Sequence, residues 1–140
     1  MKRVLLCLLI CFPLFVLAQK KPLDHSVYDA WQHVGEKLVS NDGKWIAYTI
    51  DPQEGDNELV VRSADGVYNR SIPRGYTAAF SDDSRYLVFK IKPWYRETRE
   101  ARIKKKKADD FPKDSMGILS LANDTIWKTD KVKNYKLPAK

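Results

Sequence analysis

The sequence has very little cysteine, and the positions of the few cysteines determine which kinds of fold and site can be excluded. The chain of 140 residues contains two, Cys7 and Cys11, and both lie in the first hydrophobic run. Beyond that run there is no thiol, which excludes a disulfide framework, thiol catalysis and zinc sites of the cysteine type. Histidine is almost as scarce, with His25 and His33 as its two positions.

Long hydrophobic runs are absent apart from one at the amino terminus. Lys2 and Arg3 precede the uncharged residues 4–17, and Ala18 supplies a small residue before Gln19. This order is typical of a secretory signal peptide. A transmembrane helix requires about 20 apolar residues, so an uncleaved anchor is the weaker alternative for this shorter run.

A lipoprotein signal is also disfavoured, because Cys7 and Cys11 follow bulky residues and lie early in the run. We therefore expect residues 1–18 to be an export signal that takes no part in the fold. The protein is expected to be periplasmic or extracellular, with no stable membrane anchor after signal cleavage.

The remaining chain contains an internal repeat. Residues 39–50 (VSNDGKWIAYTI) reappear 41 positions later as residues 80–91 (FSDDSRYLVFKI). In each copy a turn rich in Ser, Asn and Asp precedes an aromatic and β-branched run, which predicts a strand buried on both faces. Further predicted strands follow each copy, at 58–63, 67–72, 117–121 and 125–127. Strands and turns that repeat near every 40 residues are typical of β-propeller blades.

We therefore predict a mainly β fold of about two propeller blades, blade one over residues 37–79 and blade two over residues 80–140. Two similar hairpins in an unrelated β-sandwich are the alternative. Propellers typically need about four to eight blades, so two blades cannot close a ring and this chain is expected to begin a longer propeller. The residues expected to face neighbouring blades are Trp45, Tyr48, Tyr86, Phe89 and Ile91.

Residues 19–36 are predicted to contain a short helix over residues 24–34. Asp24 is placed to cap it and Gly35 to end it, and its apolar face is formed by Val27, Tyr28, Trp31 and Val34. His25 and His33 lie at its two ends, where they are either polar edge residues or members of a metal site. Metal pairs on a helix usually sit four residues apart and need further ligands, so we expect no metal and no cofactor.

Two charged segments carry further hypotheses. An acidic loop contains Gly55 and either forms a solvated turn, which we favour, or binds calcium through Asp51, Glu54, Asp56 and Glu58. Residues 90–107 hold nine cations and two carboxylates and therefore carry a net charge of +7. The formal net charge of the whole chain is also +7. Their spacing predicts an exposed basic helix within an insertion over residues 94–115 of blade two.

The basic insertion has two interpretations. Trp94 and Tyr95 beside the cations are compatible with a nucleic-acid surface. The expected export argues against nucleic acid as a partner, so we favour a solvated helix or one that docks on another domain of the same polypeptide.

Several segments resemble the amino-terminal end of exported prolyl oligopeptidase family serine peptidases of Bacteroidetes. They are the repeat block at 40–50, KPLDHSVYDAW at 21–31, DPQEGD at 51–56, IPRGY at 72–76 and IKPWYRETREARIKKKK at 91–107. In that family a β-propeller caps a carboxy-terminal α/β-hydrolase domain and restricts entry to peptides. The resemblance therefore implies that hydrolase domain and peptide substrates as partners.

The catalytic machinery of that family is not predicted in this chain. A nucleophile elbow reads Gly-x-Ser-x-Gly. No serine after residue 18 has glycines at both flanking positions, and these serines are 26, 40, 63, 71, 81, 84, 115 and 120. Both histidines precede the first repeat, so no catalytic residue is assigned. The expected function is to gate peptide access to a hydrolase domain. The alternative is a non-enzymatic envelope propeller that binds a protein partner.

Overall fold

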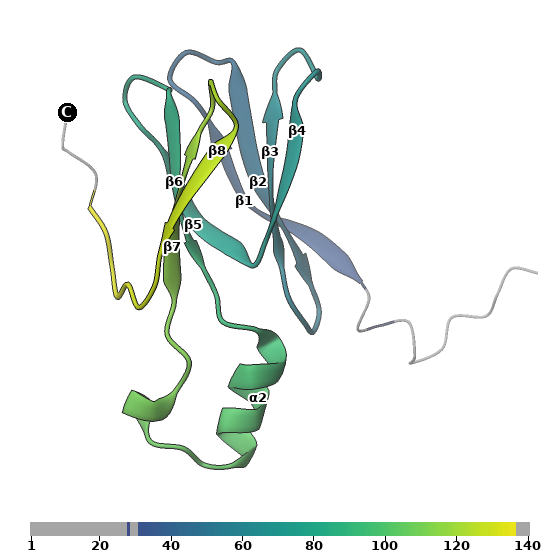
Figure 1. Cartoon of the computed structure of the whole chain (residues 1–140). Helices are drawn as coiled ribbons and strands as arrows, with labels where there is room; N and C mark the ends of the chain where they lie inside the picture. Colours follow the sequence, from purple (N-terminus) through teal and green to yellow (C-terminus); the bar gives the residue numbers. More distant parts are fainter. Residues whose placement is uncertain (1–27, 29–30, 137–140) are drawn as a thin grey trace, which may run out of the picture.

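The computed structural model describes residue 28 and residues 31–136. This part of the chain forms two four-stranded antiparallel sheets, each with its strands in chain order (Figure 1). Sheet one contains β1 (Gln32–Val39), β2 (Trp45–Pro52), β3 (Glu58–Ser63) and β4 (Asn69–Pro73). Sheet two contains β5 (Gly75–Phe80), β6 (Tyr86–Ile91), β7 (Ser115–Ser120) and β8 (Thr125–Thr129). The connection from β6 to β7 carries helix α2 (Tyr95–Ile103) and a short 3-10 helix over Ala108–Asp110.

The two sheets confirm the predicted fold class, which is mainly β with about two propeller blades and an inserted helix. The repeat extends to the strand register. Val39 lies opposite Ile46 in sheet one, and Phe80 lies opposite Leu87 at the repeated position in sheet two. Both first hairpins also contain a register shift, one after Val34 and the other after Tyr76. The two blades are therefore copies of one structural unit.

The boundary between the blades lies earlier than predicted. Residues 75–79 of β5 lie in the predicted blade one, but β5 pairs with β6 and begins sheet two. Sheet one therefore ends before Arg74, and sheet two begins after it. The turn of residues 81–85 joins two antiparallel strands, and the strand before that turn therefore belongs with the strand after it. The repeat found in the sequence begins at this turn, one strand later than the structural blade.

The predicted amino-terminal helix is wrong at its carboxyl end. Gln32 lies opposite Pro52 and Val34 lies opposite Ile50, so this segment belongs to β1. Pairing with β2 satisfies the backbone N–H and C=O groups of the segment, and it overrides the local helical spacing of the apolar residues. The export signal and most of the predicted helix lie outside the described residues.

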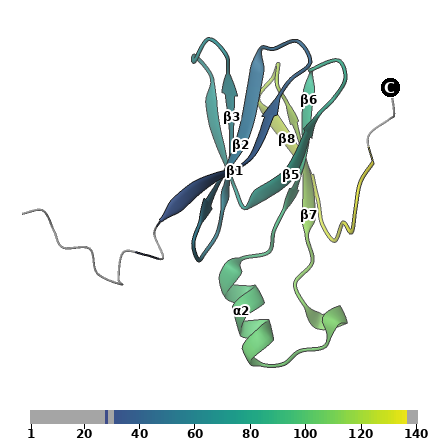
Figure 2. The same cartoon turned by 180° about the vertical axis from the view of Figure 1, so that it is seen from behind.

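The core is one cluster of buried side chains from both sheets. Figure 2 shows the two sheets side by side, seen from behind. Its fully buried large apolar side chains come from β3, β6 and β7, namely Leu59, Val61, Leu87, Phe89 and Leu119. Close packing requires a glycine at two positions. A Cβ at Gly75 would lie 2.6 Å from the Leu59 Cβ, and a Cβ at Gly117 would lie 2.4 Å from the Phe89 Cζ. Both distances are shorter than any real contact between carbon atoms.

Three hairpin turns use one hydrogen-bonding pattern built on a Ser-x-Asp sequence. The Ser40 hydroxyl donates to the Asp42 carboxylate at 2.5 Å and accepts the Trp45 N–H at 3.0 Å. The same contacts join Ser63 to Asp65 and Tyr68, and Ser81 to Asp83 and Tyr86. These side chains satisfy amides that the turn leaves without a strand partner, as the composition of the turns predicts.

Candidate functional site

The residues that would carry peptidase chemistry do not come together in the described part of the chain. His33 lies exposed on β1, whereas His25 lies outside the described residues. Ser40, Ser63 and Ser81 are engaged in the hairpin turns. Within residue 28 and residues 31–136 no group of three or more His, Cys, Asp or Glu side chains is placed to hold a metal ion.

Each of the four carboxylates of the acidic loop accepts a hydrogen bond within the protein, and two of them accept it from Tyr95. Asp51 accepts the Thr49 hydroxyl at 2.7 Å, and Glu58 accepts the Ser71 hydroxyl. Glu54 accepts the Tyr95 hydroxyl, and Asp56 accepts the Tyr95 backbone N–H at 2.8 Å. Two of the loop's carboxylates thus hold the start of α2, a role that the sequence did not indicate.

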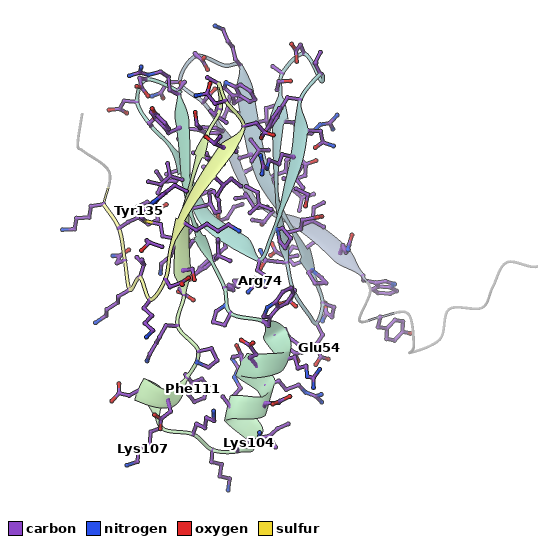
Figure 3. The ribbon with its side chains drawn as sticks, in the orientation of Figure 1. Glu54, Arg74, Lys104, Lys107, Phe111 and Tyr135 are labelled. Carbon is purple, nitrogen blue, oxygen red and sulfur yellow. The ribbon has the colours of Figure 1, made fainter. Side chains whose placement is uncertain are left out.

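Arg74 connects the two blades at the place where α2 begins, as its label in Figure 3 shows. Its backbone N–H donates to the Asn57 carbonyl at 2.7 Å, and its carbonyl accepts the Lys92 N–H at 2.9 Å. Its guanidinium donates to the Lys92 carbonyl at 2.8 Å and lies 3.8 Å from the centre of the Trp94 ring. Arg74 therefore fixes the segment that leads from β6 into the inserted helix.

Two aromatic residues at the start of the insertion, Trp94 and Tyr95, serve this attachment. One face of the Trp94 ring is covered by Arg74, and the Tyr95 hydroxyl is bonded to Glu54. Both side chains therefore take part in anchoring the helix, although Trp94 is still 48% exposed. The basic helix is anchored on the end of blade one, while its far end, marked by Lys104 in Figure 3, projects away from the sheets.

A cleft of about 340 Å³ lies between α2 and the loop before β3. On the sheet side it is lined by Asp56, Asn57 and Lys92. On the helix side it is lined by Tyr95, Thr98, Arg99 and Arg102, which follow one face of the helix at spacings of three and four residues. This cleft is the candidate site in the described part of the chain, because it joins both blades and the insertion.

The cations of α2 fall into two groups that behave differently. On the outer side Arg96 and Lys104 both pair with Glu100, at 3.1 Å and 3.7 Å. On the cleft side, no ion pair within 4.0 Å joins Arg99 or Arg102 to a carboxylate of residues 31–136. The cleft is therefore lined by two arginines without an ion pair among the described residues, together with the carboxylate of Asp56.

Asn57 was not identified from the sequence. Its side chain is 5% exposed, and its Nδ2 donates to the Gly75 carbonyl at 2.6 Å. Its Oδ1 is buried and has no hydrogen-bond partner among the described residues. No sequence signal marks this residue, because its burial arises only when the second sheet closes over the loop.

Polar contacts also join the two sheets away from the cleft. The Glu36 carboxylate accepts the backbone N–H groups of Thr77 at 3.0 Å and Ala78 at 3.2 Å, where β5 shifts register. Asp124 accepts hydrogen bonds from Tyr68 and Arg70. The pKa of Tyr68 is raised to about 12, mainly because the side chain is partly buried and secondly because its hydroxyl is bonded to Asp124. These contacts fix the relative position of the blades.

Comparison with known proteins supports the fold and does not show a family. No protein-family model matches the chain, and no curated protein matches it. A solved acylaminoacyl peptidase in complex with Z-Gly-Gly-Phe-chloromethyl ketone is similar with a TM-score of 0.56 and 13% identity, over 81% of this chain and 16% of that one. The β-propeller domain of the Trilobed protease from Pyrococcus furiosus is similar with a TM-score of 0.51 and 13% identity, over 74% of this chain and 29% of that one.

These likenesses show β-propeller blades as the fold of the described chain. The chain spans less than a third of either structure. Among the helices of the described residues, none combines the length and the apolar character that crossing a bilayer would require.

Proposed function

We propose that this chain is the propeller portion of a secreted or periplasmic prolyl oligopeptidase-like serine peptidase. It gates peptide access to an α/β-hydrolase domain that belongs to the same full-length polypeptide. The catalytic serine, its base and the oxyanion hole are supplied by that domain, and the mechanism is acyl transfer through a serine nucleophile. This chain contributes selection of substrates and takes no part in bond cleavage.

The observation that carries the proposal is that side chains at equivalent positions of the two repeats are buried to different extents. On β6 the side chains that face sheet one are almost fully buried: Leu87 and Phe89 are 0% exposed and Ile91 is 6% exposed. Their counterparts 41 positions earlier are Ile46, which is 38% exposed, and the half-buried Tyr48 and Ile50. The same structural face is therefore covered in the second blade and open in the first.

The open face of sheet one fits a position inside a larger ring. Val34 and Val39 of β1 extend it and are 50% and 65% exposed. Sheet two covers the opposite face of sheet one, so a further blade on the open face would repeat the packing already present between the two sheets. The similarity to larger peptidase structures supports the same interpretation.

The test is to express the complete reading frame that contains this chain. We expect a Gly-x-Ser-x-Gly motif after Lys140, hydrolysis of peptide substrates and labelling of that serine by a fluorophosphonate. Deletion of the propeller should allow the hydrolase domain to cleave folded proteins that the whole enzyme rejects. A reading frame with further blades and no such motif would support the envelope-binding alternative.

Two controls separate the parts of this proposal. Purified residues 19–140 should not hydrolyse chromogenic peptides or react with the fluorophosphonate, because they contain no nucleophile elbow. Mass spectrometry of the exported protein should find an amino terminus at Gln19. A fluorophosphonate adduct on residues 19–140 would contradict the assignment of catalysis to another domain.

A further inference from the structure

We propose that the lysine run at the tip of the insertion, residues 104–107, is a processing site. An endopeptidase that cleaves after lysine hydrolyses one peptide bond of the run and converts this chain into two chains that stay associated. The bond between the lysine carbonyl carbon and the next amide nitrogen breaks, the carbon takes the hydroxyl of a water molecule, and the nitrogen takes the remaining hydrogen. The proposed function is not needed for this step, because another enzyme carries it out on this chain.

The lysine run is accessible from solvent. Every residue from 102 to 110 is exposed, and Lys104 and Lys107 mark the part of the insertion that projects away from the sheets in Figure 3. A protease has to take several consecutive residues of its substrate into its own cleft, and proteolytic nicking concentrates at exposed polar loop tips for this reason. The run can therefore enter a protease while both sheets stay folded.

The backbone is strained where α2 ends and the run begins. The Lys105 N–H donates to the Arg102 carbonyl at 3.0 Å, and the Lys106 N–H donates to the Ala101 carbonyl at the same distance. These two bonds form the Schellman ending of a helix, whose left-handed residue is usually glycine. Here that residue is Lys105, with a φ of 49°, a conformation that is unfavourable for a residue with a side chain. The last turn of α2 therefore opens more readily than a turn that ends on glycine.

Exposed cations of the two sheets lie on backbone that a protease reaches less easily. Lys44 and Arg85 lie in hairpin turns, where aspartate side chains accept their N–H groups. Arg62 and Lys128 lie in strands and are paired within the sheets. Cleavage at these positions requires a turn or a strand to leave its hydrogen bonds first, and this opening costs more free energy than fraying of a helix end. The lysine run is therefore expected to be cut before them.

Sheet two holds the two fragments together after the cut. The bond that breaks lies in the connection between β6 and β7, so β6 stays with the first fragment and β7 with the second. The two strands pair with each other along their whole length. Leu87 and Phe89 of β6 are fully buried in one core with Leu119 of β7. The fragments therefore share backbone hydrogen bonds and apolar packing that do not depend on the insertion.

Each side of the insertion is attached to the blades independently of the other. At the start of α2, the Arg74 guanidinium covers the Trp94 ring. On the return to β7, the Asp114 carboxylate accepts the Tyr76 hydroxyl and also the Lys90 ammonium, the latter at 3.2 Å. A cut in the lysine run leaves both attachments in place and releases only the tip between them. Because α2 loses its covalent link to β7, its amides should exchange hydrogen faster while those of β6 and β7 stay protected.

The experiment uses the full-length protein recovered from the cells that produce it. Mass spectrometry should find a new carboxyl terminus at a lysine of the run and the matching amino terminus directly after it. The two fragments should elute together in native size-exclusion chromatography and separate in a denaturing gel. Limited digestion of recombinant uncut protein with a lysine-specific endopeptidase should make its first cut between β1 and β8 in the same run.

Two matched variants test the lysines of the run. The first removes them, as Lys104→Gln, Lys105→Gln, Lys106→Gln and Lys107→Gln. The second removes four exposed lysines of β8 and the segment after it, as Lys128→Gln, Lys131→Gln, Lys133→Gln and Lys136→Gln. The first should slow cleavage between β6 and β7 at least about tenfold, because a protease pocket built for lysine rejects glutamine, whereas the second should stay within about twofold. All eight side chains are exposed, so both variants retain the fold.

An uncut run in the recovered protein would overturn the proposal, and so would a first cut elsewhere between β1 and β8. Fragments that separate in native buffer would show that sheet two does not hold them and would overturn the two-chain product. Equal slowing of cleavage in the two variants would show that the lysines of the run are not the site. A full-length protein without peptidase activity would refute the proposed function and leave these results unchanged.

Discussion

At the scale of single residues, the hairpin turns depend on ionised aspartates. The hydrogen bond from Ser81, together with the contacts from Arg85, lowers the pKa of Asp83 to about 2 from an ordinary value of 3.8. Asp42 and Asp65 have a lowered pKa for the same first cause, a hydroxyl donated by Ser40 or Ser63. Because the folded state favours the charged form, these groups stabilise the protein above their ordinary pKa and lose that contribution as the pH falls, which for Asp83 happens as the pH approaches about 2.

The prediction is that Asp83→Asn reduces the sensitivity of the fold to acid. The asparagine cannot be protonated in this range, so the β-sheet circular dichroism signal should fall less between pH 4 and pH 2 than in the unaltered chain. At neutral pH the variant should be slightly less stable because it loses the ionic contact with Arg85. Asp109→Asn in the 3-10 helix is the control, and an equal acid transition in both variants would refute the role of the turn.

A second residue-scale prediction concerns Gly117. Its missing side chain leaves space for the fully buried Phe89 ring, so Gly117→Ala should destabilise β6 and β7 by about 1–3 kcal/mol. Hydrogen exchange of the amides in those strands measures the loss. Phe89→Leu removes the colliding atoms, and the alanine should cost less in that background. Equal costs in the two backgrounds would show that the contact is not responsible.

At the scale of elements, α2 is held by few contacts and should open before the sheets do. The Arg74–Trp94 contact is worth about 1 kcal/mol, so Trp94→Ala should raise the rate of tryptic cleavage within α2 about fivefold. Trp127→Ala on β8 changes the same residue type, 58% exposed, away from the helix and should leave that rate unchanged. Identical cleavage in both variants would mean that Trp94 does not anchor the helix.

At the scale of the whole molecule, the open face of sheet one governs behaviour in solution. A domain is stable by only about 5–15 kcal/mol, and one uncovered inter-blade face forfeits several kcal/mol of apolar burial at about 25 cal/mol per Å². Residues 19–140 alone should therefore self-associate or unfold without a steep transition. Sedimentation velocity combined with thermal unfolding tests this expectation. A monomer with one steep, reversible transition would refute it.

The repeat provides a matched pair of substitutions for this prediction. Ile46→Lys lies on the open face, where the side chain is 38% exposed, and it should reduce self-association while the sheets remain folded. Leu87→Lys changes the counterpart in the second blade, which is 0% exposed, and it should abolish the fold because the ammonium would be buried without a partner. Similar effects of the two changes would contradict the assignment of an open and a covered face.

The sequence by itself determined the repeated unit of this protein. The Ser-x-Asp turns and the apolar runs at 45–50 and 86–91 are local signals, since hydroxyl, carboxylate and strand-forming residues act within a few positions of one another. The exposed inserted helix is also local, because the Arg96, Glu100 and Lys104 spacing fits a helix in the absence of any neighbour.

Only the tertiary structure decided where the blades begin and which residues meet in the cleft. Residues 32–34 carry a helical pattern, yet strand pairing with β2 satisfies more backbone groups and prevails. Asn57 is an ordinary loop residue in the sequence and becomes a buried acceptor when sheet two closes beside it. Arg99 differs from Arg96 only because Trp94 and Tyr95 dock the helix in one orientation, and such long-range packing leaves no local pattern to read.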